Sequence, residues 1–186
     1  MNARFLTGLS LFLLAASQVS ADPKQEATKP AEYVIGEMHV QTLPPLNFVY
    51  GSAETTFEKL GEVVNKYLPL LGTAIDEGRI RPTAGCMLVY RNMTDLSKPF
   101  TLEVGWLVSD KTKATAELKL RKTEPFKCAT VMYTGAMANM GKVYEKLMGD
   151  VAAAGLAPSG ESREMYLYWE GPDSVNNVVQ VQLGVK

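Results

Sequence analysis

The stretch that decides the fold is "ESREMYLYWEG", Glu161 to Gly171. Its apolar and aromatic run, Met165 to Trp169, is typical of a β-strand with both faces buried. Because side chains alternate along a strand, Glu164 is expected on the same face as Tyr166 and Tyr168. Burying a carboxylate is costly unless it is paired or hydrogen-bonded, so a Glu at the head of an aromatic row requires an explanation.

This strand ends the second of two stretches that resemble each other, Glu37 to Tyr90 and Glu117 to Trp169. Each begins with an alternating strand, followed by a β run that ends at a tyrosine close to a glycine. These runs are "FVYG", Phe48 to Gly51, and "VMYTG", Val131 to Gly135. A helical pattern, a turn containing proline and an aromatic strand follow in both stretches. The shared order indicates an internal repeat, although a general β-α-β pattern would also produce part of it.

Apolar side chains at helical spacing predict one amphipathic helix in each half. The positions are Phe57, Leu60, Val64, Tyr67 and Leu71 in the first half, and Met140, Val143, Leu147 and Val151 in the second. Gly78 and Gly155 are expected to end these helices, and Pro69 to kink or split the first one. A further strand closes each half, at Thr101 to Val108 and at Asn177 to Val185.

These elements predict an α+β fold of two pseudo-symmetric strand-helix-strand-strand repeats. An amphipathic helix must pack on a sheet, so each repeat should form an antiparallel layer with its helix on one face. A groove between two similar halves is a usual place for a ligand. The sequence therefore predicts a central ligand groove between the two repeats.

The N-terminal residues have the features of a signal peptide, which we expect at residues 1–21. Arg4 precedes the apolar run "FLTGLSLFLLAA", Phe5 to Ala16, and the small residues "VSA", Val19 to Ala21, precede the expected cleavage site. The apolar run is shorter than the roughly 20 residues that span a bilayer. We therefore expect a periplasmic or secreted protein without stable membrane insertion after cleavage, with an uncleaved anchor as the alternative. Residues 22–34 should form a flexible leader, and residues 35–186 the folded domain.

Composition excludes several classes of function. The formal net charge is −1, so the chain lacks the basic surface of a nucleic-acid-binding protein. His39 is the only histidine, which argues against a His-based catalytic triad and against a metal site with several histidines. We expect no cofactor and no metal. Cys86 and Cys128 are either a disulfide of an exported protein or two small buried residues, and the sequence leaves this open.

Four motifs together resemble a known family. They are "TLPPLNFVYG" from Thr42, "FKCATVMYTG" from Phe126, "APSGESREMYLYWEGP" from Ala157 and "VVQVQLGV" from Val178. Their order and spacing resemble the GyrI-like small-molecule-binding domain, which is also the effector-binding domain of AraC-type and MerR-type multidrug regulators. The resemblance covers about Tyr33 to Lys186.

The resemblance implies an antiparallel α+β fold with a central aromatic pocket and a buried Glu. In the family this Glu belongs to an E-x-Y motif, which matches Glu164 and Tyr166 here. Members of the family bind lipophilic, often cationic, small molecules. Some stand-alone members resemble hydrolases that open strained cyclopropane rings with the pocket Glu and an aromatic hydroxyl.

We therefore expect the chain to bind a small lipophilic molecule, cationic ones included, with Glu164 as the negative charge of the pocket. Strand-borne aromatic residues with polar tips are the expected walls, namely Tyr90, Trp106, Tyr133, Tyr166 and Tyr168. One alternative is a hydrolase that uses Glu164 with Tyr133 or Tyr166, and another is a structural or partner-binding envelope protein. The sequence favours a binding protein over an enzyme. It leaves open the identity of the ligand and whether the chain forms a homodimer.

Overall fold

The computed structural model describes residues 33–93, 95, 97–112 and 117–186. The expected signal peptide, and the leader up to residue 32, lie outside the described residues. The strands are β1 (Val34–Ile35), β2 (His39–Leu43), β3 (Asn47–Thr55), β4 (Pro82–Arg91), β5 (Phe100–Val108), β6 (Lys119–Lys122), β7 (Phe126–Thr134), β8 (Pro158–Tyr168) and β9 (Val178–Val185). The helices are α2 (Leu60–Asp76) and α3 (Met140–Ala153), preceded by 3-10 turns at Phe57–Lys59 and Met137–Asn139.

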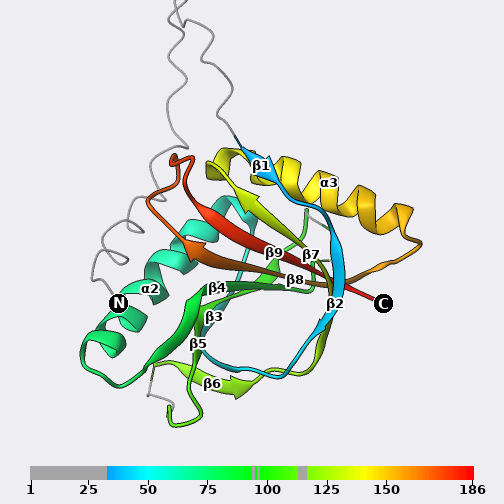
Figure 1. Cartoon of the computed structure of the whole chain (residues 1–186). Coiled ribbons are helices and arrows are strands. Elements are labelled where there is room, and N and C mark those ends of the chain that lie inside the picture. The colour runs from blue at the N-terminus through cyan, green and yellow to red at the C-terminus, as the bar shows by residue number, and fades with distance from the viewer. Residues whose placement is uncertain (1–32, 94, 96, 113–116) are drawn as a thin grey trace, which may run out of the picture.

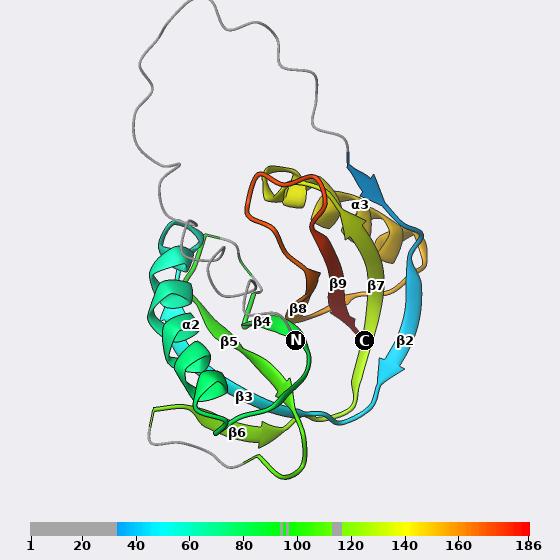
Figure 2. The ribbon, with the colours of Figure 1, turned by 60° about the vertical axis from the view of Figure 1, so that its left-hand side comes forward.

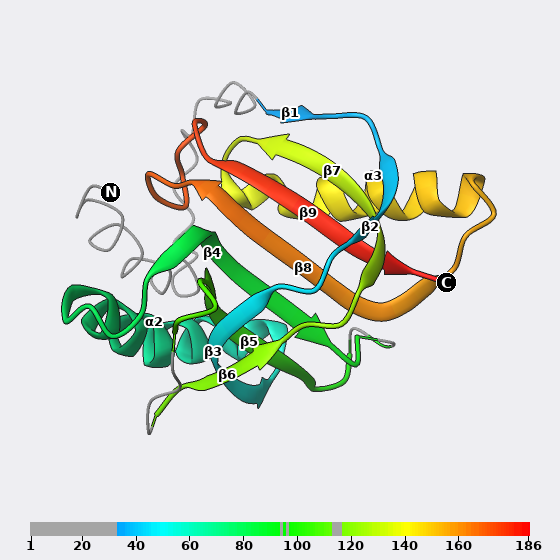
Figure 3. The same ribbon diagram turned by 60° about the horizontal axis from the view of Figure 1, so that its bottom comes forward.

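Within the described residues, all nine strands belong to one antiparallel sheet in the order β1-β7-β9-β8-β4-β5-β3-β6, with β2 also paired to β7. Figure 3 shows the strands in front and both helices behind them, so the helices lie on the same face of the sheet. The expected α+β class with an antiparallel sheet is confirmed. The strand-helix-strand-strand order occurs in both halves, as β3-α2-β4-β5 and as β7-α3-β8-β9 (Figure 1).

The two halves meet where β4 pairs with β8 at the centre of the sheet. In this register Leu88 lies opposite Glu164, and Cys86 lies opposite Tyr166. The helices contact the outer strands of their own halves, α2 at β3 and β5 and α3 at β7. Figure 2 shows α2 and α3 apart from each other, with β4 and β8 between them. The packing therefore leaves the centre of the helix-bearing face without a helix above it.

Both helices are held by most of the apolar faces that the sequence predicts, except that Phe57 and Met140 line a cavity instead. In α2 the buried side chains include Val64, Tyr67 and Leu71, and in α3 they are Val143, Leu147 and Val151. Pro69 is exposed and α2 continues through it, so of the two effects expected of this proline, a kink or a split, the split is wrong. Gly78 and Gly155 follow the helices in the left-handed conformation, with φ of 70° and 71°, as expected of helix ends.

Cys86 and Cys128 are buried free thiols, so they do not form the disulfide that the sequence left open. They lie on β4 and β7, which β8 and β9 separate in the sheet. Burial raises the pKa of Cys86 to about 12 and that of Cys128 to about 11, so both thiols stay protonated at neutral pH. None of the described helices combines the length and the apolarity that a membrane-spanning segment requires.

Candidate functional site

A cavity of about 760 Å³ lies on the helix-bearing face, over the junction of β4 and β8. This volume is in the range of pockets that hold small molecules, roughly 300–1,000 Å³. Side chains from both helical segments and from the central strands line it. They include Phe57, Leu60, Val64, Cys86, Leu88, Tyr90, Met93, Met137, Met140, Tyr144, Met148, Ser162, Glu164, Tyr166 and Leu183. The lining is therefore mostly apolar and aromatic, and rich in methionine.

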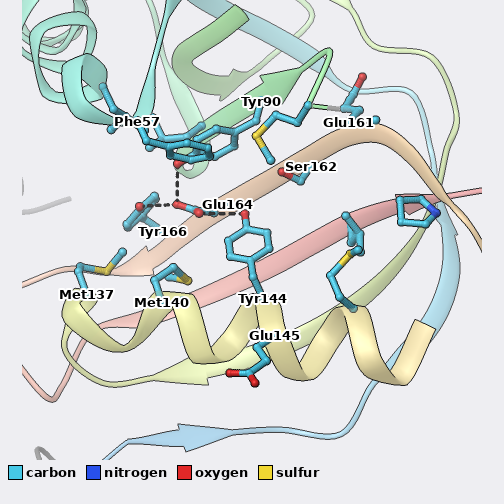
Figure 4. Close-up of a pocket in the computed structure, with 18 of the residues that line it drawn as sticks. Phe57, Tyr90, Met137, Met140, Tyr144, Glu145, Glu161, Ser162, Glu164 and Tyr166 are labelled. Atoms are coloured by element: carbon cyan, nitrogen blue, oxygen red, sulfur yellow. Dashed lines mark hydrogen bonds between the residues drawn. The ribbon is translucent and has the colours of Figure 1, made fainter. Parts of the chain in front are cut away.

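Glu164 is the polar centre of this cavity and is only 4% exposed. Its Oε2 accepts hydrogen bonds from the hydroxyls of Tyr166 at 2.7 Å and Tyr90 at 3.1 Å. Its Oε1 accepts a hydrogen bond from the hydroxyl of Tyr144 at 2.9 Å. Figure 4 shows the three tyrosines converging on the carboxylate. The cluster therefore joins β8, β4 and α3 through one acidic group.

The local sequence explains why these groups meet. Tyr166 is two residues after Glu164 on β8, so both side chains lie on the same face. Leu88 is the cross-strand partner of Glu164, and Tyr90 lies two residues further along the same face of β4. Tyr144 follows the buried Val143 on α3 and reaches the sheet from the side of the helix that borders the cavity.

Burial raises the pKa of Glu164, and the hydrogen bonds from Tyr166, Tyr144 and Tyr90 partly oppose this effect. No Lys or Arg side chain among the described residues forms an ion pair with Glu164. Burial and the nearby carboxylate raise the pKa of all three tyrosines well above the ordinary value, so their hydroxyls remain neutral donors. The cluster thus contains one carboxyl group, and no basic group in the described part of the chain pairs with it.

This environment predicts a pH dependence of stability. Because the pKa of Glu164 is raised above its ordinary value of 4.5, the folded protein binds more protons than the unfolded chain over the pH range between the two pKa values. The contribution of Glu164 to the free energy of unfolding is therefore fully present below this range and falls as the pH rises through it. Glu164→Gln should show a smaller loss of stability than the wild type as the pH rises above about 4.5, measured by chemical denaturation. Equal slopes for the two proteins would contradict the raised pKa.

The other residues expected to line the pocket lie elsewhere. Tyr133 is fully buried, and its hydroxyl donates a hydrogen bond to the carbonyl of Ala136. Trp106 belongs to the buried hydrophobic core and lies on β5, which contacts α2. Tyr168 is 47% exposed and donates to Glu170 at 2.6 Å. These three side chains lie outside the lining of the cavity, whereas Glu164, Tyr166 and Tyr90 are brought together in it.

The prediction that Tyr168 shares a face with Glu164 is wrong. The register of β8 and β9 shifts between Tyr166 and Tyr168, so the alternation that holds from Glu164 to Tyr166 is interrupted after Tyr166. An irregularity of this kind cannot be recognised from an alternation of residue types, because Leu167 and Tyr168 are both suitable residues for a strand.

Sequence reasoning missed Tyr144. The helix prediction followed the face of Met140, Val143, Leu147 and Val151, of which the last three are buried. A neighbouring stripe, Met140, Tyr144 and Met148, repeats every four residues and lines the cavity. Its spacing is the available signal, because residues four apart lie on one side of a helix.

The remaining acids at the cavity are less suited to act as its charge. Glu161 pairs with Arg91 and with Arg163, both at 2.7 Å, so its charge is compensated. Glu145 is exposed, and Figure 4 shows its carboxylate pointing away from Glu164. No three His, Cys, Asp or Glu side chains in the described part of the chain are grouped so that they could hold a metal ion.

Solved structures share this fold at low sequence identity. The C-terminal domain of EcmrR aligns with a TM-score of 0.65 and 18% identity, covering 85% of this chain and 99% of that domain. EcmrR in its complex with DNA aligns with a TM-score of 0.66 and 19% identity. This alignment covers 83% of this chain but only 57% of the EcmrR chain. SAV2435 bound to tetraphenylphosphonium aligns with a TM-score of 0.62 and 14% identity, covering 81% of this chain and 94% of SAV2435. A hydrolase from Listeria innocua aligns with a TM-score of 0.58 and 13% identity, covering 81% of this chain and 92% of the hydrolase.

No curated protein sequence matches the chain significantly. The sequence profile of one domain family, the GyrI-like small molecule binding domain, matches residues 36–185. This match covers most of the chain and agrees with the fold that the solved structures share. The chain therefore belongs to the family of GyrI-like small molecule binding domains.

Proposed function

We propose that the protein binds a lipophilic small-molecule cation in the cavity over β4 and β8, with Glu164 as its counter-charge. The observation that carries this proposal is the buried carboxylate of Glu164, which has three hydroxyl donors but, among the described residues, no basic partner. None of the described residues that line the cavity is a Lys or an Arg. A cation is the group that such a site lacks, since a buried charge is unfavourable unless it is paired.

The walls of the cavity suit the rest of such a ligand. Phe57, Tyr90 and Tyr166 offer aromatic side chains, and a cation over an aromatic face gains about 0.5–2 kcal/mol. Met93, Met137, Met140 and Met148 offer flexible thioethers that adapt to different apolar shapes. SAV2435, which shares the fold, was solved with tetraphenylphosphonium bound, and this supports the same class of ligand here. The signal-peptide features of residues 1–21 lead us to place this binding in the periplasm or outside the cell.

The hydrolase alternative has fewer residues in its favour. Of the two proton donors that the sequence suggested, Tyr166 contacts Glu164, whereas Tyr133 lies outside the cavity and is bonded to the carbonyl of Ala136. The cavity also weakens the alternative of a purely structural envelope protein, because about 760 Å³ is left open beside an acidic group. Binding is therefore the function that the site supports best.

Titration with tetraphenylphosphonium tests this proposal. Isothermal titration calorimetry should show saturable binding of the cation, whereas neutral triphenylphosphine oxide, with similar aromatic rings, should bind at least tenfold more weakly. The protein at a cation concentration 100 times Kd should be stabilised by about 2.7 kcal/mol. Equal affinity for the two compounds, or no binding of either, would rule out a cation site.

The same titration should depend on pH. Tetraphenylphosphonium cannot lose a proton, so a change of its affinity with pH reports on the protein. Because the pKa of Glu164 is raised, the cation must displace a proton at low pH, and its affinity should rise with pH through the raised pKa. The measurement is the proton release obtained by calorimetry in buffers of different ionisation enthalpy. An affinity that does not change between about pH 5 and about pH 8 would contradict this coupling.

A further inference from the structure

We propose that the cavity selects lipophilic ammonium ions that carry a single N–H, such as protonated tertiary amines, over quaternary cations of the same shape and charge. This inference rests on the proposed function and adds the chemical class of the ligand. It follows from the number and the positions of the hydrogen bonds that Glu164 already accepts.

An ionised carboxylate has about four positions at which it can accept hydrogen bonds, two on each oxygen. Oε2 of Glu164 accepts from both Tyr166 and Tyr90, so its two positions are filled. Oε1 accepts only from Tyr144 among the described residues. One acceptor position therefore remains on Oε1, the oxygen that lies toward α3 in Figure 4.

A ligand with one N–H can fill this position. The resulting N–H···O bond would be charge-assisted and short, about 2.7–2.9 Å between N and O. The three tyrosine hydroxyls can keep their present bonds, because the ligand donates to the position that they leave free. The complex would then hold a carboxylate with all four positions occupied and one compensating positive charge.

A quaternary ammonium ion cannot make this bond. Its charge is surrounded by carbon, so the positive centre lies further from Oε1, and the attraction between charges falls with distance. The free position on Oε1 would stay unfilled in a cavity whose lining is mostly apolar. An unfilled acceptor in such surroundings costs free energy that the N–H ligand avoids.

A matched pair of probes tests this inference. N,N-dimethyl-1-adamantanamine and N,N,N-trimethyl-1-adamantylammonium share the same apolar cage and are both cationic at neutral pH, since aliphatic amines have a pKa near about 10. The protonated dimethyl compound has an N–H group where the trimethyl compound has a third N–CH₃ group. We expect the wild-type protein to bind the dimethyl compound at least about tenfold more tightly, measured by calorimetry at one pH. Tetraphenylphosphonium is titrated in parallel as the probe of the proposed function.

Tyr144→Phe supplies a second test that does not depend on the quaternary compound. Without the Tyr144 hydroxyl, Oε1 has two free acceptor positions instead of one. With fewer donors left on Oε1, the bond from a single ligand N–H should matter more, so N,N-dimethyl-1-adamantanamine should gain affinity relative to tetraphenylphosphonium, which has no N–H, when this variant is compared with the wild type. The ratio of the two affinities removes any general effect of the substitution on binding.

The outcomes separate this inference from the proposed function. Tighter binding of the dimethyl than of the trimethyl compound, together with the expected change of the affinity ratio in Tyr144→Phe, supports the inference. Equal or tighter binding of the trimethyl compound overturns the inference. Binding of tetraphenylphosphonium without binding of either adamantyl ion also overturns it. In both cases the proposed cation site remains. If none of the cations binds, the proposed function fails and the inference fails with it.

Discussion

Glu164→Gln is expected to weaken the binding of tetraphenylphosphonium at least about thirtyfold, because removing one partner of a buried charged contact costs about 2–5 kcal/mol. The substitution keeps the shape of the side chain and removes its charge. It also replaces one acceptor oxygen by an amide NH₂ group, which cannot accept the hydrogen bonds now made by Tyr166 and Tyr90 or by Tyr144. The loss should be smallest at low pH, where the wild-type carboxyl is itself protonated.

The variant should remain folded at neutral pH. A buried carboxylate without a basic partner is itself unfavourable, so neutralising it offsets part of the lost hydrogen bonding. Thermal unfolding of the variant without ligand therefore separates a loss of affinity from a loss of structure. The emission of Trp169, whose ring packs edge-on against Tyr166 at 5.5 Å, gives a second check that the cavity wall is intact.

Glu145→Gln is the matched control, because it makes the same chemical change at the same cavity. Glu145 belongs to α3 and borders the cavity, but it is exposed and points away from Glu164. Exposed charges are screened by water, so this variant should change the affinity by no more than about threefold. If Glu164→Gln binds the cation within about threefold of the wild type, Glu164 is not the counter-charge of the site.

The sequence predicted the architecture because the fold depends on patterns that repeat along the chain. Residues at helical spacing predicted α2 and α3, and the alternating strand at the start of the first stretch marked the region of β2. Each of these patterns reports on the neighbours of a residue within one element. The antiparallel α+β class follows from them, since an apolar helix face must cover a sheet.

The candidate site was only partly predictable, because its members meet through tertiary packing. Glu164 and Tyr166 could be placed together, since they are two residues apart on one strand. Tyr90 and Tyr144 reach the same carboxylate from β4 and α3, and neither contact follows from spacing along the chain. Trp106 and Tyr133 have the residue types of a pocket wall, yet both lie in the core. Their positions could not be predicted, because residue type does not reveal which part of the sheet is covered by a helix.

The stability of the fold is expected to be sensitive to an added side chain where β3 and β5 lie close together. Gly105 is the cross-strand partner of Tyr50 on β3 and of Met87 on β4. A Cβ atom added at Gly105 would lie 2.0 Å from the carbonyl oxygen of Val49 and 2.8 Å from the Phe48 ring. The oxygen belongs to the backbone of a paired strand, so it cannot move aside without separating β3 from β5.

Gly105→Ala should therefore lower the free energy of unfolding by about 3 kcal/mol, at the upper end of the usual cost of overpacking. For a chain of this length, such a loss lowers Tm by about 6–12 °C. Gly149→Ala is the matched control, because Gly149 lies in α3 and a Cβ there would meet no heavy atom within 4 Å. Replacing glycine inside a helix by alanine stabilises by about 0.5–1 kcal/mol, so the control should raise Tm. The same added methyl group is thus expected to act in opposite directions, and a Gly105→Ala variant as stable as the wild type would contradict the close approach of β3 and β5.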